Sequence, residues 1–142
     1  MKGVNPYLNF NGNTEEAFNF YKSVFGGEFS LIMRFKDTQE ASKLPANEQE
    51  KIMHIALPLK NGTILMGTDA LESMGQKLTT GNNFYICVST GSKEEGNEIF
   101  DALSVGGKIG IPYEKQFWGA WHGQFTDKFG IQWMIDFDEN YQ

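Results

Sequence analysis

The chain of 142 residues contains little cysteine, no long apolar run and no block of positive charge. Its one cysteine, Cys87, has no second thiol with which to form an internal disulfide, which is typical of proteins in a reducing cytoplasm. No apolar run approaches the roughly 20 residues of a membrane-spanning helix, and the first ten residues lack the apolar segment of an export signal. We therefore expect a soluble cytoplasmic protein that has no membrane partner.

Positive charge is scattered as well as scarce. The chain has 12 Lys and Arg against 18 Asp and Glu, which gives a formal net charge of -6. Duplex nucleic acids and anionic membrane surfaces attract basic proteins, so neither is an expected partner. Aromatic residues are abundant instead, at 14% of the chain, and the twelve phenylalanines suit a core or a pocket built from flat rings.

The first half of the chain predicts a strand, a helix and three further strands. Thr14 is a favourable helix N-cap, and Glu15 and Glu16 follow it in the first turn, where the helix dipole favours negative charge. The turn Lys60-Asn61-Gly62 between two apolar runs is a hairpin signal. We expect strands at 4–10, 28–36, 52–59 and 63–68, a helix at 14–25, and a mobile loop at 37–51.

The second half repeats this order. The segments TEEAFNFYKSVFGGE (14–28) and KEEGNEIFDALSVGGK (93–108) both carry an acidic pair, at least one aromatic residue and a double glycine, about 80 residues apart. A helix that opens at Ser92 follows a strand at 84–88, and strands at 108–112, 117–125 and 131–137 come after it. We therefore expect a single α+β domain, 1–142, built from two βαβββ modules at about 1–70 and 82–142 with a linker at about 71–81.

Four stretches carry a family resemblance: YLNFNGNTEEAFNFYKSVFGGE, IMHIALPLKNGTILMGTD, DALSVGGKIG and FWGAWHGQFTDKFGIQWMI. They resemble the PhnB-like branch of the vicinal oxygen chelate superfamily, the group of glyoxalases, bleomycin-resistance proteins and extradiol dioxygenases. The resemblance implies paired βαβββ modules that form a cupped mixed sheet around a cavity, usually in a homodimer. Some members are named demethylubiquinone methyltransferase-like by similarity, but the sequence has no glycine-rich nucleotide loop that would support methyl transfer.

The resemblance also implies where a metal would bind. In metal-dependent members, the first and last strands of each module supply four ligands, and the corresponding positions here are Asn5, Met66, Asn83 and Met134. Methionine is a soft ligand and the asparagine amide is a weak one, so this set suits no hard or borderline divalent ion. We therefore expect no cofactor, and a divalent metal stays a disfavoured alternative.

Strand alternation predicts the lining of the cup. Trp133 and Ile135 lie on one face of the last strand and Met134 on the other, so the mixed face is expected to border the cavity. By the same alternation, His54 faces away from Met53 and Ile55. A lining of methionine, aromatic and a few polar residues suits a small, partly apolar organic molecule. The expected ligand pocket comprises Tyr7, Asn9, His54, Met66, Thr68, Tyr85, Trp121, Gln132, Met134 and Asp136.

Few side chains are candidates for catalysis. His54 is the best candidate base, although a pocket wall is a commoner role for such a histidine. His122 is expected in a loop or at the pocket rim, Trp118 in the core, and Asp127 in a turn. The sequence favours a metal-free protein that binds a small ligand. The alternatives are a divalent-metal lyase or dioxygenase of the glyoxalase type and a metal-free isomerase that uses His54 or Asp136 as its base.

Overall fold

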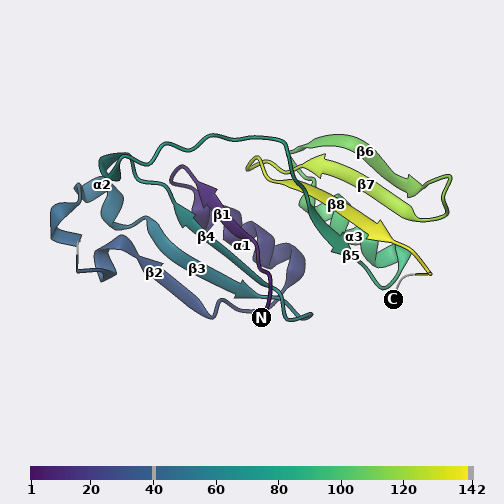
Figure 1. The fold of residues 1–142 in the computed structure, drawn as a ribbon, viewed down its shortest axis with the longest axis horizontal. Coiled ribbons are helices and arrows are strands. Elements are labelled where there is room, and N and C mark those ends of the chain that lie inside the picture. The colour runs from purple at the N-terminus through teal and green to yellow at the C-terminus, as the bar shows by residue number, and fades with distance from the viewer. Residues whose placement is uncertain (40, 141–142) are drawn as a thin grey trace. The chain divides into compact units, whose positions relative to one another are not determined.

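The computed structural model describes residues 1–39 and 41–140. The chain divides into two compact units, Met1–Thr79 and Thr80–Gln142, and the boundary lies within the expected linker. Each unit contains one four-stranded mixed sheet and one long helix, in the order strand, helix, three strands (Figure 1). This confirms the predicted α+β class and the two βαβββ modules. That the modules form a single domain stays a prediction.

The first unit has the strand order β1-β4-β3-β2, in which β1 and β4 are parallel and the other neighbours are antiparallel. The expected loop 37–51 contains short helical turns, which is a correction. One of them starts directly after Pro45, whose φ of -57° and missing N–H suit a helix start. The elements are β1 (Tyr7–Phe10), α1 (Thr14–Phe25), β2 (Leu31–Arg34), η1 (Phe35–Asp37), η2 (Ala41–Lys43), α2 (Ala46–Gln49), β3 (Ile52–Pro58), β4 (Ile64–Asp69) and η3 (Glu72–Met74).

Helix α1 covers one face of this sheet (Figure 1). Its residues Ala17, Phe18 and Tyr21 are fully buried, and Gly67 of β4 makes the close approach possible. A Cβ atom at Gly67 would lie 2.6 Å from the ring of Phe18. The face of the sheet that carries Gly67 is therefore the core face, and the opposite face is left open by α1.

The start of α1 is held by a residue from the other end of the unit. Asp69 accepts hydrogen bonds from the backbone N–H (3.0 Å) and the hydroxyl (2.6 Å) of Thr14, and from the backbone N–H of Ile52 (2.8 Å). Thr14 is the first helical residue and Asn13 stands at the N-cap, so the prediction of Thr14 as N-cap was wrong. The orphan N–H at this helix end is satisfied by a buried carboxylate at the end of β4.

The second unit has the equivalent order β5-β8-β7-β6, with β5 and β8 parallel. Its helix starts as predicted, because the Ser92 hydroxyl accepts a hydrogen bond from the N–H of Glu95 at 3.1 Å. Helix and sheet again meet at a glycine: a Cβ atom at Gly123 would lie 2.6 Å from the ring of Phe100. The elements are β5 (Ile86–Ser89), α3 (Lys93–Leu103), β6 (Lys108–Lys115), β7 (Trp121–Thr126) and β8 (Gln132–Phe137).

The turn between β7 and β8 is organised by Asp127. One carboxylate oxygen accepts the N–H groups of Phe129 (2.8 Å) and Ile131 (3.0 Å), and the other accepts the indole N–H of Trp133 at 2.9 Å. Trp133 is 2% exposed. The sequence-based roles of Asp127 in a turn and of Trp133 in the core are confirmed.

The connection between β6 and β7 differs from the prediction. Strand β7 begins at Trp121 and not at 117, because residues 116–120 form a turn in which Gly119 has a φ of +101° and the N–H of Gln116 bonds to the carbonyl of Ala120. Trp118 lies in this turn and is 54% exposed, so its predicted place in the core was wrong. Edge strand β6 contains Pro112 and two irregularities in its register with β7.

Candidate functional site

The open face of the first sheet carries the five pocket residues predicted for this unit. Cross-strand partners in a sheet share a face. Tyr7 pairs with Met66, Asn9 pairs with Thr68, and Met66 also pairs with Ala56, two residues beyond His54 on β3. The structure therefore places Tyr7, Asn9, His54, Met66 and Thr68 together on the face that α1 does not cover. Ligand binding by them stays a prediction.

Tyr7 and His54 form the closest polar contact on this face. The phenol oxygen lies 2.9 Å from Nδ1 of His54, and the ring centroids are 5.5 Å apart. Burial raises the pKa of the Tyr7 hydroxyl, and a hydrogen bond with the Thr68 side chain opposes that shift in part. The phenol is therefore neutral at physiological pH, and His54 has an uncharged partner.

A cavity of about 510 Å³ lies in the same unit. The cavity meets the open face at Thr68 and Met53. Met53 is turned away from the core face by an irregularity in the register between β2 and β3. Sequence reasoning missed this site because most of its lining comes from segments assigned to the loop and the linker. The lining residues are Phe35, Thr38, Lys43, Leu44, Met53, Thr68, Ser73, Met74 and Gln76.

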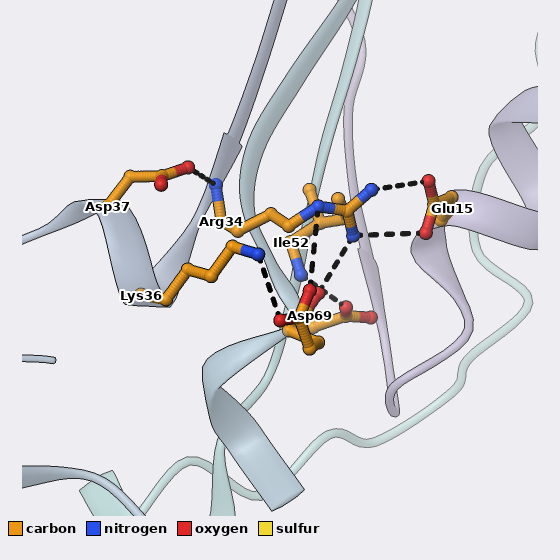
Figure 2. A network of polar contacts seen from close by, with 7 residues as sticks. Glu15, Arg34, Lys36, Asp37, Ile52 and Asp69 are labelled. Carbon is orange, nitrogen blue, oxygen red and sulfur yellow. Dashed lines mark hydrogen bonds and ion pairs between the residues drawn. The ribbon is translucent and has the colours of Figure 1, made fainter. Parts of the chain in front are cut away.

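A charged network fixes the chain where this cavity begins (Figure 2). The guanidinium of Arg34, the last residue of β2, binds both carboxylate oxygens of Glu15 at 3.0 and 2.6 Å and the carbonyl of Glu50 at 2.8 Å. Lys36 adds an ion pair with Glu50 at 2.9 Å, and Asp37 accepts the backbone N–H of Arg34. The network joins α1, β2 and the segment before β3, and so positions Phe35 at the cavity wall.

The open face of the second sheet carries Met134 and Asp136, as predicted. Met134 pairs with Cys87 and Gln124, and Asp136 pairs with Ser89 and His122. Gln132 lies on the same face of β8, but its amide donates to the backbone carbonyl of Phe84 and so ties β8 to the segment before β5.

Trp121, Tyr85 and His122 lie in three different environments in this unit. Trp121 pairs with Phe137, and by the alternation of β7 it shares the face of Gly123 that packs on α3, so it does not share a face with Met134. Its place at a pocket rim stays a prediction. Tyr85 precedes β5 and is 41% exposed. His122 is not in a loop: it lies on β7, and its side chain is 12% exposed.

His122 is the functional candidate that sequence reasoning underrated. Its Nδ1 lies 3.4 Å from a carboxylate oxygen of Asp136, and its Nε2 lies 3.0 Å from the amide nitrogen of Gln124. The ring centroid of Trp118 is 6.0 Å away. Alignment of the two modules by strand register would have indicated the site, because His54 and His122 then fall at the same position.

The positions to which the family resemblance assigns metal ligands hold weak or soft donors, and binding without a divalent metal stays a prediction. The side-chain oxygen of Asn5 already accepts a hydrogen bond from the N–H of Ile64 at 2.8 Å. The other assigned ligand position in that unit is the thioether of Met66. In the second unit the positions are Asn83 and Met134. Within residues 1–39 and 41–140, no three His, Cys, Asp or Glu side chains form a group that could hold a metal. Among the same residues, no helix is both long and apolar enough to cross a membrane.

Two mixed sheets of this connectivity, each with one helix on one face, define the glyoxalase/bleomycin-resistance/dioxygenase fold, which recurs in solved structures under 25% identical to this chain. The family described as 3-demethylubiquinone-9 3-methyltransferase matches residues 2–136. The chain belongs to this family, the PhnB-like branch of the vicinal oxygen chelate superfamily.

Individual relatives agree with this assignment. Protein YjdN of Escherichia coli K12 is 33% identical over 94% of this chain and 93% of its own. The crystal structure of PA1353 from Pseudomonas aeruginosa is 34% identical with a TM-score of 0.83, over 95% of this chain and 96% of that one. A putative 3-demethylubiquinone-9 3-methyltransferase, PhnB protein, from Bacillus cereus is 25% identical with a TM-score of 0.77, over 95% and 98%.

Proposed function

We propose that this protein binds a small, partly apolar organic molecule in the cavity of its first unit, without a divalent metal. The cavity itself is the observation that carries the proposal. Its volume of about 510 Å³ falls in the range of small-molecule sites, which are mostly apolar with a few polar groups. Phe35, Leu44, Met53 and Met74 supply the apolar surface, and methionine adapts to irregular ligands.

The polar side chains that line the cavity are Thr38, Lys43, Thr68, Ser73 and Gln76. Thr68 lines the cavity and also lies on the open face with Tyr7 and His54, so a ligand that extends from the cavity past Thr68 would approach this pair. The donor chemistry at Asn5 and Met66 supports binding without a divalent ion. The homodimer that the family resemblance implies stays a prediction, and light scattering after size-exclusion chromatography would test it.

The proposal is tested by ligand screening. We expect at least one compound from a panel of small aromatic and antibiotic-like molecules to raise the free energy of unfolding, by about 2.7 kcal/mol at one hundred times its dissociation constant. Isothermal titration of that compound should then show at least tenfold weaker binding to Met53→Glu. Val4→Glu, which adds the same charge at a position 84% exposed in the same unit, should bind like the wild type. If both variants bind the compound with equal affinity, the compound binds outside this cavity.

A metalloenzyme is the first alternative. Chelator-treated protein is unfolded by heat with and without Zn, Ni, Co, Mn or Fe(II). We expect no single metal to raise the melting temperature specifically. A metal that saturates a specific site at one thousand times its dissociation constant would add about 4 kcal/mol. Such a shift with one ion would replace the metal-free proposal by a metal-dependent lyase or dioxygenase.

A metal-free isomerase is the second alternative, and the Tyr7–His54 hydrogen bond is the observation that favours it. A histidine held by a phenol in a binding face is placed for proton transfer. His54→Ala would then abolish turnover of a substrate that the cavity binds, whereas retained turnover would exclude His54 as the base.

A further inference from the structure

The first unit holds a second cavity, of about 610 Å³, which the proposed function does not use. Its walls come from one edge of the sheet, where the turn after β1, the residues just before β3 and the segment after β4 meet. Gln76 lines this cavity as well as the first one, so the two are neighbours. We call it the polar cavity, because amides and charged side chains make up most of its lining: Asn11, Asn47, Glu48, Lys51, Glu72 and Lys77.

Glu48 is the buried charge of the polar cavity. It is 5% exposed, and its two carboxylate oxygens accept hydrogen bonds from the hydroxyl and, at 3.4 Å, from the backbone N–H of Ser73. Ser73 is neutral, and among residues 1–39 and 41–140 no cation lies within ion-pair distance of Glu48. Burial of a carboxylate is unfavourable unless a positive charge compensates it. The cavity beside Glu48 is the place from which such a charge can come.

Lys51 carries the opposite charge, but its side chain does not pair with Glu48. Its ammonium lies over the turn after β1, where a Cβ atom at Gly12 would be 3.1 Å from Nζ. The backbone N–H of Lys51 donates to the carbonyl of Glu48 at 3.2 Å, so the main chain and not an ion pair joins the two residues. Within the part of the chain that the structure describes, no carboxylate pairs with the Lys51 ammonium. A carboxylate and an ammonium that do not neutralise each other therefore border one cavity.

The segment after β4 adds a second charge of each sign. Glu72 and Lys77 are exposed, line the same cavity and form no ion pair with any described residue. The charged lining thus consists of two carboxylates and two ammonium groups, whose formal charges cancel. Binding sites are specific for ligands whose charges complement their own. A balanced lining disfavours a polyanion and matches a ligand that carries one charge of each sign.

We propose that the polar cavity binds a small zwitterion of the α-amino acid class. The ammonium group of the ligand pairs with Glu48, and its carboxylate group pairs with Lys51. The amides of Asn11 and Asn47 offer donors and acceptors to a polar ligand side chain. This inference goes beyond the proposed function and does not rest on it, because the charges that define it are separate from the apolar lining of the first cavity.

The test is isothermal titration of the protein with L-serine, L-threonine and L-glutamine. Acetate and ethylammonium, which carry one charge each, are the comparison probes. We expect at least one amino acid to bind, about tenfold or more tightly than either comparison probe, because only the zwitterion pairs with both charges. Lys51→Met should weaken binding of that amino acid about tenfold or more. Lys60→Met removes the same charge from an exposed turn of the same unit and should bind like the wild type.

A second variant tests the other half of the site. Glu48→Gln removes the negative charge and keeps an acceptor for the Ser73 hydroxyl, and it should also weaken binding about tenfold or more. Glu16→Gln, at an exposed position of α1, is its control. Circular dichroism and thermal unfolding establish that each variant is folded. If Glu48→Gln does not fold, Lys51→Met and its control decide the test.

Three results would overturn the proposal. They are no binding of any of the three amino acids, wild-type affinity in a folded Lys51→Met, and binding of acetate or ethylammonium as tight as that of the amino acid. The ¹H–¹⁵N spectrum of the wild type locates the ligand independently, because the amide signals of residues 47–51 and 70–78 should shift during the titration. Shifts confined to other residues would contradict the assigned cavity. The screen of aromatic compounds against the first cavity is read separately, so either proposal can fail without the other.

Discussion

The carboxylate of Asp69 binds both the backbone N–H and the hydroxyl of Thr14, a residue 55 positions earlier in the chain. Both residues are almost fully buried. The contact ties the end of β4 to the first turn of α1, and a third bond to Ile52 ties in β3. One carboxylate thus joins three of the five main elements of the first unit.

Asp69→Asn should destabilise the first unit by about 1–3 kcal/mol, because an amide NH₂ group replaces an acceptor oxygen and leaves a buried donor unsatisfied. The urea concentration at half-unfolding measures the loss. Asp37→Asn is the matched control, since that exposed carboxylate accepts the single N–H of Arg34 and its change should cost under about 1 kcal/mol. Equal effects of the two changes would contradict the role given to Asp69.

Gly123→Ala should destabilise the second unit by about 1–3 kcal/mol through overpacking. The new Cβ would lie 2.6 Å from the Phe100 ring and 2.8 Å from the Tyr113 Cα, and the backbone atom cannot move aside as a flexible side chain could. Gly110→Ala on β6 is the control, because its nearest atom would be 3.7 Å away. Thermal unfolding compares them, and similar melting temperatures would show that β7 and α3 are less closely packed.

The Glu15–Arg34 pair should contribute pH-dependent stability. The hydrogen bonds from Arg34 lower the pKa of Glu15, against a smaller opposing effect of burial. The contribution is therefore present above the ordinary glutamate pKa of 4.5 and is lost as the pH falls through the lower pKa of the folded state. The Glu15 side chain is 46% exposed, so solvent screening limits the effect to about 0.5–1 kcal/mol.

Glu15→Gln should accordingly melt below the wild type at pH 7, and the difference should shrink as the pH is lowered past 4.5. The exposed Glu16→Gln in the same helical turn serves as the control. A difference that stays constant down to the most acidic pH at which the protein is folded would contradict the ion-pair interpretation.

Cys87 should react slowly with iodoacetamide at neutral pH. Cys87 is exposed on its strand, but partial desolvation raises the pKa of its thiol. A hydrogen bond with Ser89 opposes that shift in part, and the negative charge of Asp136 raises the pKa further, so the midpoint of the rate–pH profile should lie above 9.0. Asp136→Asn should speed alkylation at a fixed pH, whereas Glu94→Gln on α3 should not. A midpoint below 9.0 in the wild type would show that the thiol is more solvated than its strand position indicates.

The elements that depend on local chemistry could be predicted from the sequence. Ser92 as a helix cap and Asp127 as a turn residue act through neighbours a few positions away, so the pattern alone indicates them. Strict alternation also placed Met134 and Asp136 on the correct face of β8. The duplicated order of elements then fixed the fold class.

The features that depend on distant contacts could not be predicted. The N–H of Thr14 finds its partner 55 residues away, and Met53 leaves the face that alternation assigned to it because β3 has an extra residue opposite β2. Trp121 alternates in phase with Gly123, so it lies on the face of β7 that packs on α3 and not on the face of Met134. His122 contacts Asp136, which only the register of β7 with β8 brings beside it, whereas its other partner Gln124 lies two positions along the same strand.

Strand β6 has a consequence for how copies of this protein meet in concentrated solution. An outer strand with a regular row of free N–H and C=O groups invites another chain to add to the sheet, which leads to aggregation. Pro112 has no backbone N–H to donate, and the two register irregularities interrupt the regular row of backbone N–H and C=O groups along β6. Lys108 and Lys115 place a positive charge at each end of the strand. The edge of the second sheet is thereby protected against strand addition, although Ile109 and Ile111 are exposed along it.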